Sequence, residues 1–414
     1  MRARKAREGE IVVGKNKDIV LFAKLLSACA FGNGRIDDSN EINWDFVFAA
    51  ARKSDVLSLL LPAFRMNGGV RPENLALVEK RAAADAYSET KKSSCATRLL
   101  NVLKDNGIRA VVLKGLAYKS LYPYPELRRM SDLDLFIPDG DLKRVYEVAQ
   151  TIGNVESDEI HHFTIDKILN VETTASVYPD DENSLFNEHL LNSEITDDSV
   201  CSFSFYNDEL YTLTPTHNLL YCAYHMFKHF IFGGIGARQM CDFALLASKF
   251  SDEIDWSYIL SQSERAKMTK FIFALMRIAE VYFGVDASKL YECSAQIVDD
   301  ETAYEIWADM LEGGVFGVSA HEREIARSIV FRRIKERSSG EAQTGLRAAF
   351  PPLSYMRNEL SYVDSMTFLL PIGWTHRICR FVFCRLFRRG EFKIVSKARK
   401  SADKRLKIMD KLDI

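Results

Sequence analysis

Two aspartates separated by one residue, Asp132 and Asp134, lie in the segment 130–137. In a β-strand the two carboxylates project from the same face, because side chains alternate between the faces of a strand. Carboxylates held close together repel each other, and a divalent cation relieves that repulsion. Mg²⁺ prefers oxygen ligands and is held by one or two carboxylates together with substrate phosphates. The pair therefore predicts a magnesium site for phosphate chemistry, with a solvated strand edge as the alternative.

A lysine and a glycine, Lys114 and Gly115, follow the short run 108–113, which is rich in β-branched residues. A glycine lets backbone amides approach phosphate oxygens closely, and the lysine adds a mobile positive charge. We expect both residues to bind the phosphates of a nucleotide.

A third carboxylate is needed to hold a second metal ion or to accept a proton, and the segment 168–178 supplies Glu172. Two ions about 4 Å apart could then clamp the attacking and leaving oxygens of an in-line displacement. The alternative is that Glu172 is an exposed strand residue.

Two arginines could neutralise further phosphate charge, as arginine does bidentately. Arg128 lies shortly before the aspartates; the alternative is a salt bridge that orders the loop. Arg238 ends the glycine-rich segment 232–238, whose amides could bind phosphate at a helix N-terminus. The alternative there is a turn in which Arg238 pairs with Asp242, four residues later.

Two histidines four residues apart, His225 and His229, share one face of a predicted helix. The residues between them lack the glutamate of a zinc-hydrolase motif, so zinc binding is disfavoured. We expect them instead to line a cleft opposite the carboxylates.

These motifs together resemble a known family, the uncharacterised bacterial nucleotidyltransferases of the polymerase-beta superfamily. The residues that carry the resemblance are Leu113-Lys114-Gly115, Tyr122-Pro123, Arg128 and Asp132-Leu-Asp134, followed by the segments 214–229, 236–242, 254–256 and 369–374. The resemblance implies a small mixed sheet with flanking helices and bound Mg²⁺. It also implies transfer of a nucleoside monophosphate from a nucleoside triphosphate, such as ATP, to an acceptor hydroxyl.

Two other functions stay open. Superfamily members usually carry Gly-Gly or Gly-Ser shortly before the aspartates, whereas here 16 residues separate Gly115 from Asp132. This departure leaves room for a nucleotide-binding regulatory protein with little or no turnover. The other alternative is a toxin-like enzyme that nucleotidylates transfer RNA. The acceptor, whether a small molecule, a peptide or an RNA, is set by pocket shape and not by these motifs.

The hydrophobic periodicity divides the chain into four regions and predicts an α+β, mainly helical fold. Residues 1–107 form an N-terminal helical region that ends in a long helix near 73–105. Residues 108–212 form the α/β nucleotidyltransferase core, with strands at 108–113, 133–137 and 168–178 and a helix at 141–151 capped near Asp139. Residues 213–345 form a helical domain, and residues 346–414 a basic C-terminal segment. The later predicted helices span 237–249, 255–264, 267–283, 299–312 and 319–336.

Composition and charge exclude some classes of protein. The 55 lysines and arginines nearly balance 57 aspartates and glutamates, so the whole chain lacks the positive surface of a duplex-binding protein. The region from Arg377 onward is basic, with 13 lysines and arginines against four acidic residues, and residues 377–411 could contact an anionic surface weakly. The favoured alternative is a solvated helix with one docked face. We expect no signal peptide and no transmembrane segment, hence a cytoplasmic protein.

Overall fold

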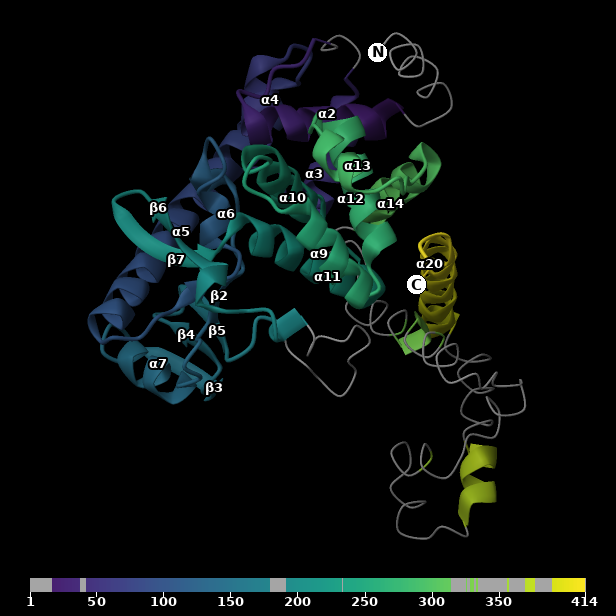
Figure 1. The fold of residues 1–414 in the computed structure, drawn as a ribbon. Helices are drawn as coiled ribbons and strands as arrows, with labels where there is room; N and C mark the ends of the chain where they lie inside the picture. Colours follow the sequence, from purple (N-terminus) through teal and green to yellow (C-terminus); the bar gives the residue numbers. More distant parts are fainter. Residues whose placement is uncertain are drawn as a thin grey trace. The chain divides into compact units, whose positions relative to one another are not determined.

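The computed structural model describes residues 17–37, 42–178, 191–232, 234–313 and 389–413, with short pieces between 325 and 376. Figure 1 labels the described helices and strands. The chain divides into two compact units. The first comprises residues 1–229, 234–317 and 411–414, and contains the sheet and most of the described helices. The second comprises residues 230–233 and 318–410, and contains most of helix α20 (Arg389–Lys411).

One mixed sheet of seven strands forms the centre of the α/β region, in the order β3-β4-β5-β2-β1-β7-β6. The strands are β1 (Val111–Val112), β2 (Asp132–Phe136), β3 (Val155–Glu159), β4 (His162–Ile165), β5 (Leu169–Thr174), β6 (Val200–Phe205) and β7 (Asp208–Leu213). The β2–β5 and β1–β7 pairs are parallel, whereas β1–β2 and the hairpin pairs are antiparallel. The chain is therefore an α+β, mainly helical protein with a mixed sheet, which confirms the predicted fold class.

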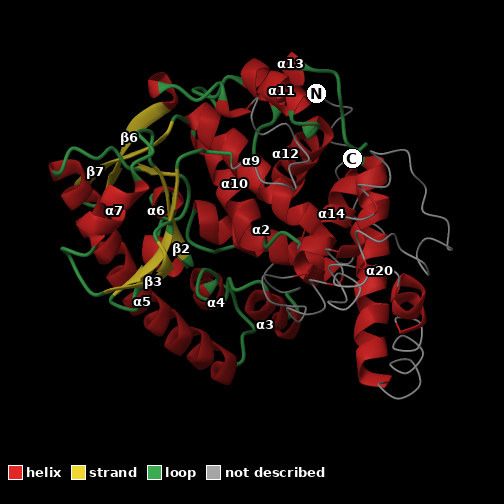
Figure 2. Ribbon diagram, turned by 90° about the horizontal axis from the view of Figure 1, so that it is seen from below, coloured by secondary structure: helices red, strands yellow, loops and turns green. Residues whose placement is uncertain are grey.

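Helices cover both faces of this sheet. The long helix α5 (Pro72–Asp105) contacts β5, β7 and α7 (Leu142–Ala149), and Figure 2 shows α5 and α7 on one side of the sheet, with α9 (Pro215–Phe232) and α10 (Ala237–Lys249) on the other. The short helices α6 (Leu116–Lys119) and η2 (Pro125–Leu127) lie in the connection from β1 to β2.

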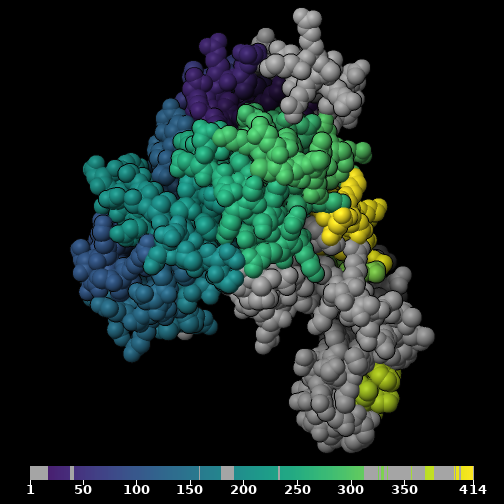
Figure 3. Space-filling view, in the orientation of Figure 1, coloured from purple at the N-terminus to yellow at the C-terminus, as the bar shows by residue number. Residues whose placement is uncertain are grey.

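The remaining helices of this unit extend the helical layers. Among the described residues they are α2 (Lys17–Phe31), α3 (Trp44–Lys53), α4 (Leu61–Met66), the 3-10 helix η3 (Asp197–Ser199), α11 (Trp256–Arg265), α12 (Thr269–Phe283), α13 (Ser288–Cys293) and α14 (Asp300–Gly313). Helix α12 contacts α2, α10 and α14, and apolar residues along it, such as Phe271 and Leu275, are fully buried. Figure 3 shows the sheet region in continuous contact with the helices that follow it.

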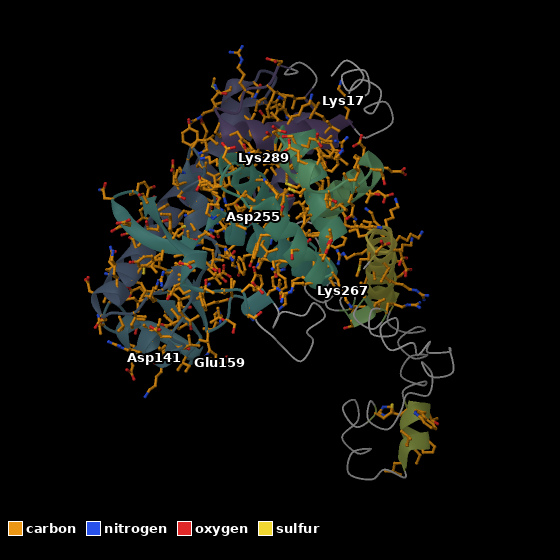
Figure 4. All side chains as sticks on the ribbon, viewed as in Figure 1. Lys17, Asp141, Glu159, Asp255, Lys267 and Lys289 are labelled. Atoms are coloured by element: carbon orange, nitrogen blue, oxygen red, sulfur yellow. The ribbon has the colours of Figure 1, made fainter. Side chains whose placement is uncertain are left out.

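The predicted helices agree well with the structure, because their boundaries depend on local signals. The long helix expected near 73–105 spans Pro72–Asp105, with proline at its first position, where a missing N–H is tolerated. The helix expected at 237–249 has those bounds. The N-cap of α7 is Asp141, labelled in Figure 4, and not Asp139: the Asp141 carboxylate accepts a hydrogen bond from the Arg144 amide at 3.1 Å. The helix expected at 319–336 lies largely outside the described residues.

The predicted strands were partly wrong. The strand expected at 108–113 contains only Val111–Val112, because the Ile108 amide still donates to Leu103 in the last turn of α5. The strand expected at 168–178 ends at Thr174, whose hydroxyl bonds to the backbone of Ser176 and turns the chain. Strands β3, β4, β6 and β7 were not predicted.

Candidate active site

The three acidic residues expected to bind metal lie together on one face of the sheet. In the parallel β2–β5 pair, Asp134 is the register partner of Glu172, so their side chains leave the sheet side by side. Asp132 projects from the same face of β2, two residues earlier. One carboxylate oxygen from each of the three residues lies within 4.8 Å of the others. The opposite face of these strands is apolar, since Leu133, Leu135 and Val171 are fully buried.

The environment of this carboxylate cluster fits a divalent cation. Asp134 is buried, Asp132 is half-buried and Glu172 is exposed. Burial, together with the neighbouring charges of Asp132 and Glu172, raises the pKa of Asp134 to about 7, although Lys114 opposes the shift. The buried Oδ2 atom of Asp134 has no hydrogen-bond partner among the described residues. An unpaired carboxylate oxygen beside two further carboxylates is a donor set suited to Mg²⁺.

Lys114 supplies the positive charge nearest to this cluster. Its Nζ lies 3.2 Å from Oδ1 of Asp134 and 3.7 Å from Oδ1 of Asp132. Burial alone would lower the pKa of Lys114, but the two aspartates outweigh burial and raise it. Lys114 therefore stays charged and balances part of the acidic cluster.

Gly115 follows in a backbone conformation that side chains disfavour, with φ at 59°. A Cβ at this position would lie 2.9 Å from Sδ of Met130 and 3.2 Å from the carbonyl oxygen of Asp132. The glycine is required here for a close approach to the segment that enters β2.

Helix α9 places the two histidines beside Lys114. Nε2 of His225 lies 3.4 Å from Nζ of Lys114 and 3.2 Å from Nε2 of His229. Burial and nearby positive charges, Lys114 foremost among them, lower the pKa of His225 well below its usual value and that of His229 to about 4. Both imidazoles are therefore neutral near pH 7, and His225 can accept a hydrogen bond from Lys114.

Arg128 lies in a different environment from the carboxylate cluster. Its buried guanidinium donates to both carboxylate oxygens of Asp242 in α10, at 3.1 and 2.6 Å, and Tyr122 donates to the same carboxylate at 2.7 Å. Asp242 outweighs the effect of burial and raises the pKa of Arg128. The contacts match the salt bridge that orders the loop, which sequence analysis gave as the alternative to phosphate binding.

Arg238 does not form the ion pair with Asp242 that was expected as the alternative to phosphate binding, because Asp242 is paired with Arg128 instead. One guanidinium nitrogen of Arg238 donates to the carbonyl of Arg129 at 2.8 Å. Its buried Nε has no partner within the part of the chain that the structure describes. Arg238 lies close enough to His225 to help lower the pKa of that imidazole. The Nε donor of Arg238 is therefore left for a partner that the described residues do not supply.

Two neighbours of the site were missed in the sequence. His162 of β4 is the register partner of Glu172 on its other side, and its Nε2 lies 3.7 Å from Oε1 of Glu172. Gln239 of α10 contacts Nδ1 of His225 through Nε2 at 3.4 Å. No motif signals that either residue contacts the site, since both contacts depend on which elements become neighbours.

Sheet, helices and cluster together define a class: an α+β protein whose mixed sheet presents three carboxylates, with a lysine and a neutral histidine facing them from adjoining elements. The chain belongs to the family of uncharacterised nucleotidyltransferases, whose family model matches residues 40–284. Membership supports nucleotidyl transfer as the class of reaction. No curated protein and no solved structure matches the chain. Among the described residues, no helix combines the length and apolarity needed to cross a bilayer.

Proposed function

We propose that this protein transfers a nucleoside monophosphate from a nucleoside triphosphate to an acceptor hydroxyl, in a reaction that depends on Mg²⁺. The observation that carries the proposal is the cluster of Asp132, Asp134 and Glu172, whose ligand atoms lie within 4.8 Å of one another on paired strands. The orphaned Oδ2 of Asp134 adds to it, because a buried carboxylate oxygen without a partner is costly unless a ligand completes it.

Each residue has a distinct role in this proposal. Asp132, Asp134 and Glu172 hold one or two Mg²⁺ ions, which neutralise triphosphate charge and polarise the α-phosphorus when bound. Lys114 contacts the triphosphate oxygens, and Gly115 lets the chain after Lys114 pack closely against the segment that enters β2. The acceptor oxygen forms a bond to the α-phosphorus, the bond to pyrophosphate breaks, and Glu172, the most exposed carboxylate of the three, accepts the hydroxyl proton.

Helices α9 and α10 complete the site from the other side. The neutral His225 holds Lys114 by a hydrogen bond, and the free donor of Arg238 binds a phosphate oxygen. Arg128 acts through its salt bridge to Asp242, which anchors the loop that leads into β2. His229, next to His225, lines the same side of the site.

Incubation of the full chain with labelled nucleoside triphosphates, Mg²⁺ and cell extract tests the proposal. We expect label on a small molecule, peptide or RNA, and loss of labelling in the Asp132→Asn plus Asp134→Asn variant. The matched control is Glu156→Gln, which removes a strand carboxylate paired with Lys167 and outside the cluster. Equal labelling by the wild type and the double variant would contradict the assignment.

A second function is favoured by one observation. Nζ of Lys114 bridges Asp132 and Asp134, so the protein itself neutralises part of the cluster. A nucleotide-binding regulatory protein with little turnover would suit such a balanced site. Tight nucleotide binding in calorimetry without release of pyrophosphate would support this function over the first.

A further inference from the structure

A buried glutamate on α5 joins the two segments that carry the site residues. The Glu89 side chain is 1% exposed, and its Oε2 accepts a hydrogen bond from the backbone amide of Met130 at 2.9 Å. The same oxygen lies 2.7 Å from Nζ of Lys119, whose side chain is fully buried. Met130 stands two residues before Asp132, and Lys119 stands at the end of α6, which begins directly after Gly115.

Lys92, one turn further along α5, completes this contact. Its Nζ lies 3.0 Å from Oε1 of Glu89 and donates to the carbonyl oxygen of Met130 at 2.6 Å. Both backbone polar groups of Met130 are thus bound by side chains of one helix. The backbone position at the entrance to β2 is fixed by α5 as well as by the sheet.

The contact to Lys119 fixes the other segment. Nζ of Lys119 also donates to Ser93 of α5 at 3.2 Å, so α6 is attached to α5 at two points. Between the two attached segments, Gly115 packs directly against Met130 and the Asp132 carbonyl. Glu89 thereby closes a ring that runs through Lys119, Gly115 and Met130 and back to Glu89.

Stability alone does not account for this arrangement. A buried ion pair loses hydration, and apolar residues of similar volume in its place are often neutral or stabilising. Burial would raise the pKa of Glu89, but Lys119 and Lys92 outweigh burial and lower it, so the carboxylate is charged. A charged carboxylate accepts a stronger hydrogen bond from the Met130 amide than a neutral carboxyl group would. A pair of apolar residues could not replace this directional hydrogen bond to the Met130 backbone.

We propose that Glu89 is a positioning residue of the nucleotidyl-transfer site: by holding the Met130 amide and Lys119 together, it fixes Asp132 and Asp134 relative to Lys114 and Gly115. The inference rests on the proposed function, since it assigns Glu89 to the same metal site. Misplacement of the aspartates lowers metal affinity and the rate of transfer, whereas nucleotide contacts outside the cluster are kept.

The test measures Mn²⁺ affinity by electron paramagnetic resonance on the full chain, together with the thermal midpoint. Glu89→Gln keeps the side-chain shape, and we expect it to weaken Mn²⁺ binding by about 10-fold, the lower end of what supporting residues of metal sites contribute. With an identified acceptor, kcat should fall more than the KM for nucleotide rises. The double variant Glu89→Leu plus Lys119→Met removes both buried charges, so it should regain stability while Mn²⁺ binding stays weak.

A matched control is Asp300→Asn, which breaks the ion pair with Arg277 between α12 and α14. We expect this variant to lower the thermal midpoint without altering Mn²⁺ affinity. The inference is overturned if the double variant binds Mn²⁺ as tightly as the wild type. Failure of the proposed metal site itself gives a different result, because the Asp132→Asn variant would then bind Mn²⁺ as tightly as the wild type.

Discussion

Asp134 of β2 and Glu172 of β5 are register partners in adjacent parallel strands. Their carboxylates therefore leave the same face of the sheet at neighbouring positions, with Asp132 two residues earlier. This relationship turns a common pair of aspartates into a three-carboxylate cluster. It also means that changes in strand pairing, and not only changes in the acids themselves, affect the site.

Replacing one acid of the cluster should stabilise the protein in the absence of metal. Asp134→Asn removes a buried charge that two neighbouring carboxylates repel, so we expect the thermal midpoint without divalent ions to rise by about 2–4 °C. Mg²⁺ or Mn²⁺ should raise the wild-type midpoint by mass action and leave the variant unchanged. Scanning fluorimetry with and without metal measures both effects. A variant that still responds to metal would show that Asp134 is not a ligand.

Gly115 should tolerate no side chain. Gly115→Ala places a methyl group at positive φ and within 2.9 Å of Sδ of Met130, so we expect a loss of about 2–4 kcal/mol in the free energy of unfolding. The added methyl group would displace the segment from Met130 to Asp132, which enters β2. Transfer activity should therefore fall on the order of 10-fold or more. Chemical denaturation and labelling assays measure the two losses.

The control for this prediction is Gly107→Ala. Gly107 also has a positive φ, but an added Cβ would have nothing within 4 Å. The Gly107→Ala substitution should lower the free energy of unfolding by only about 1–2 kcal/mol and leave activity intact. Equal activity losses in both variants would refute the close-approach argument.

The buried pair of Arg128 and Asp242 should behave as an anchor of the loop. Arg128→Met leaves Asp242 buried beside Tyr122 without its cation, and we expect a loss of about 3–5 kcal/mol. Arg128→Met plus Asp242→Leu removes both charges and should recover more than half of this loss. The Tyr122 hydroxyl, which loses its acceptor, accounts for the remainder.

Nucleotide affinity then separates the two roles of Arg128. If it only anchors the loop, the double variant should keep the KM for nucleoside triphosphate close to the wild-type value. A stable double variant with a strongly raised KM would show direct contact between Arg128 and the triphosphate.

Stability should depend on pH through Lys119. Burial lowers the pKa of Lys119 to about 8, against the opposing effect of Glu89. Between about pH 8 and the usual lysine pKa of about 10.4, Lys119 is protonated in the unfolded state but not in the folded state. The free energy of unfolding therefore increases as the pH rises through this window. Relative to the Glu89→Leu plus Lys119→Met variant, we expect the wild type to gain up to about 3 kcal/mol across this window. Denaturation curves of both proteins at pH 7.5 and 10.5 measure the difference in the free energy of unfolding. A difference that does not change with pH would contradict a buried Lys119 with a lowered pKa.

The sequence by itself determined the local features of this protein. Alternation along β2 placed Asp132 and Asp134 on one face, and proline and periodic apolar residues set the bounds of α5, because both signals act within a few residues. The motif around Lys114 and Asp132 also led to the correct family. The short β1 and strands such as β4 escaped detection, since their pairing depends on distant partners.

Only the tertiary structure decided which groups meet. The pairing of β2 with β5 brought Glu172 to the aspartates, and the packing of α9 brought His225 to Lys114. Arg128 bonded to Asp242, a partner that spacing along α10 had suggested for Arg238. The local pattern of residues decides which face of a strand or helix is buried, but which distant segment packs against that face depends on the tertiary structure.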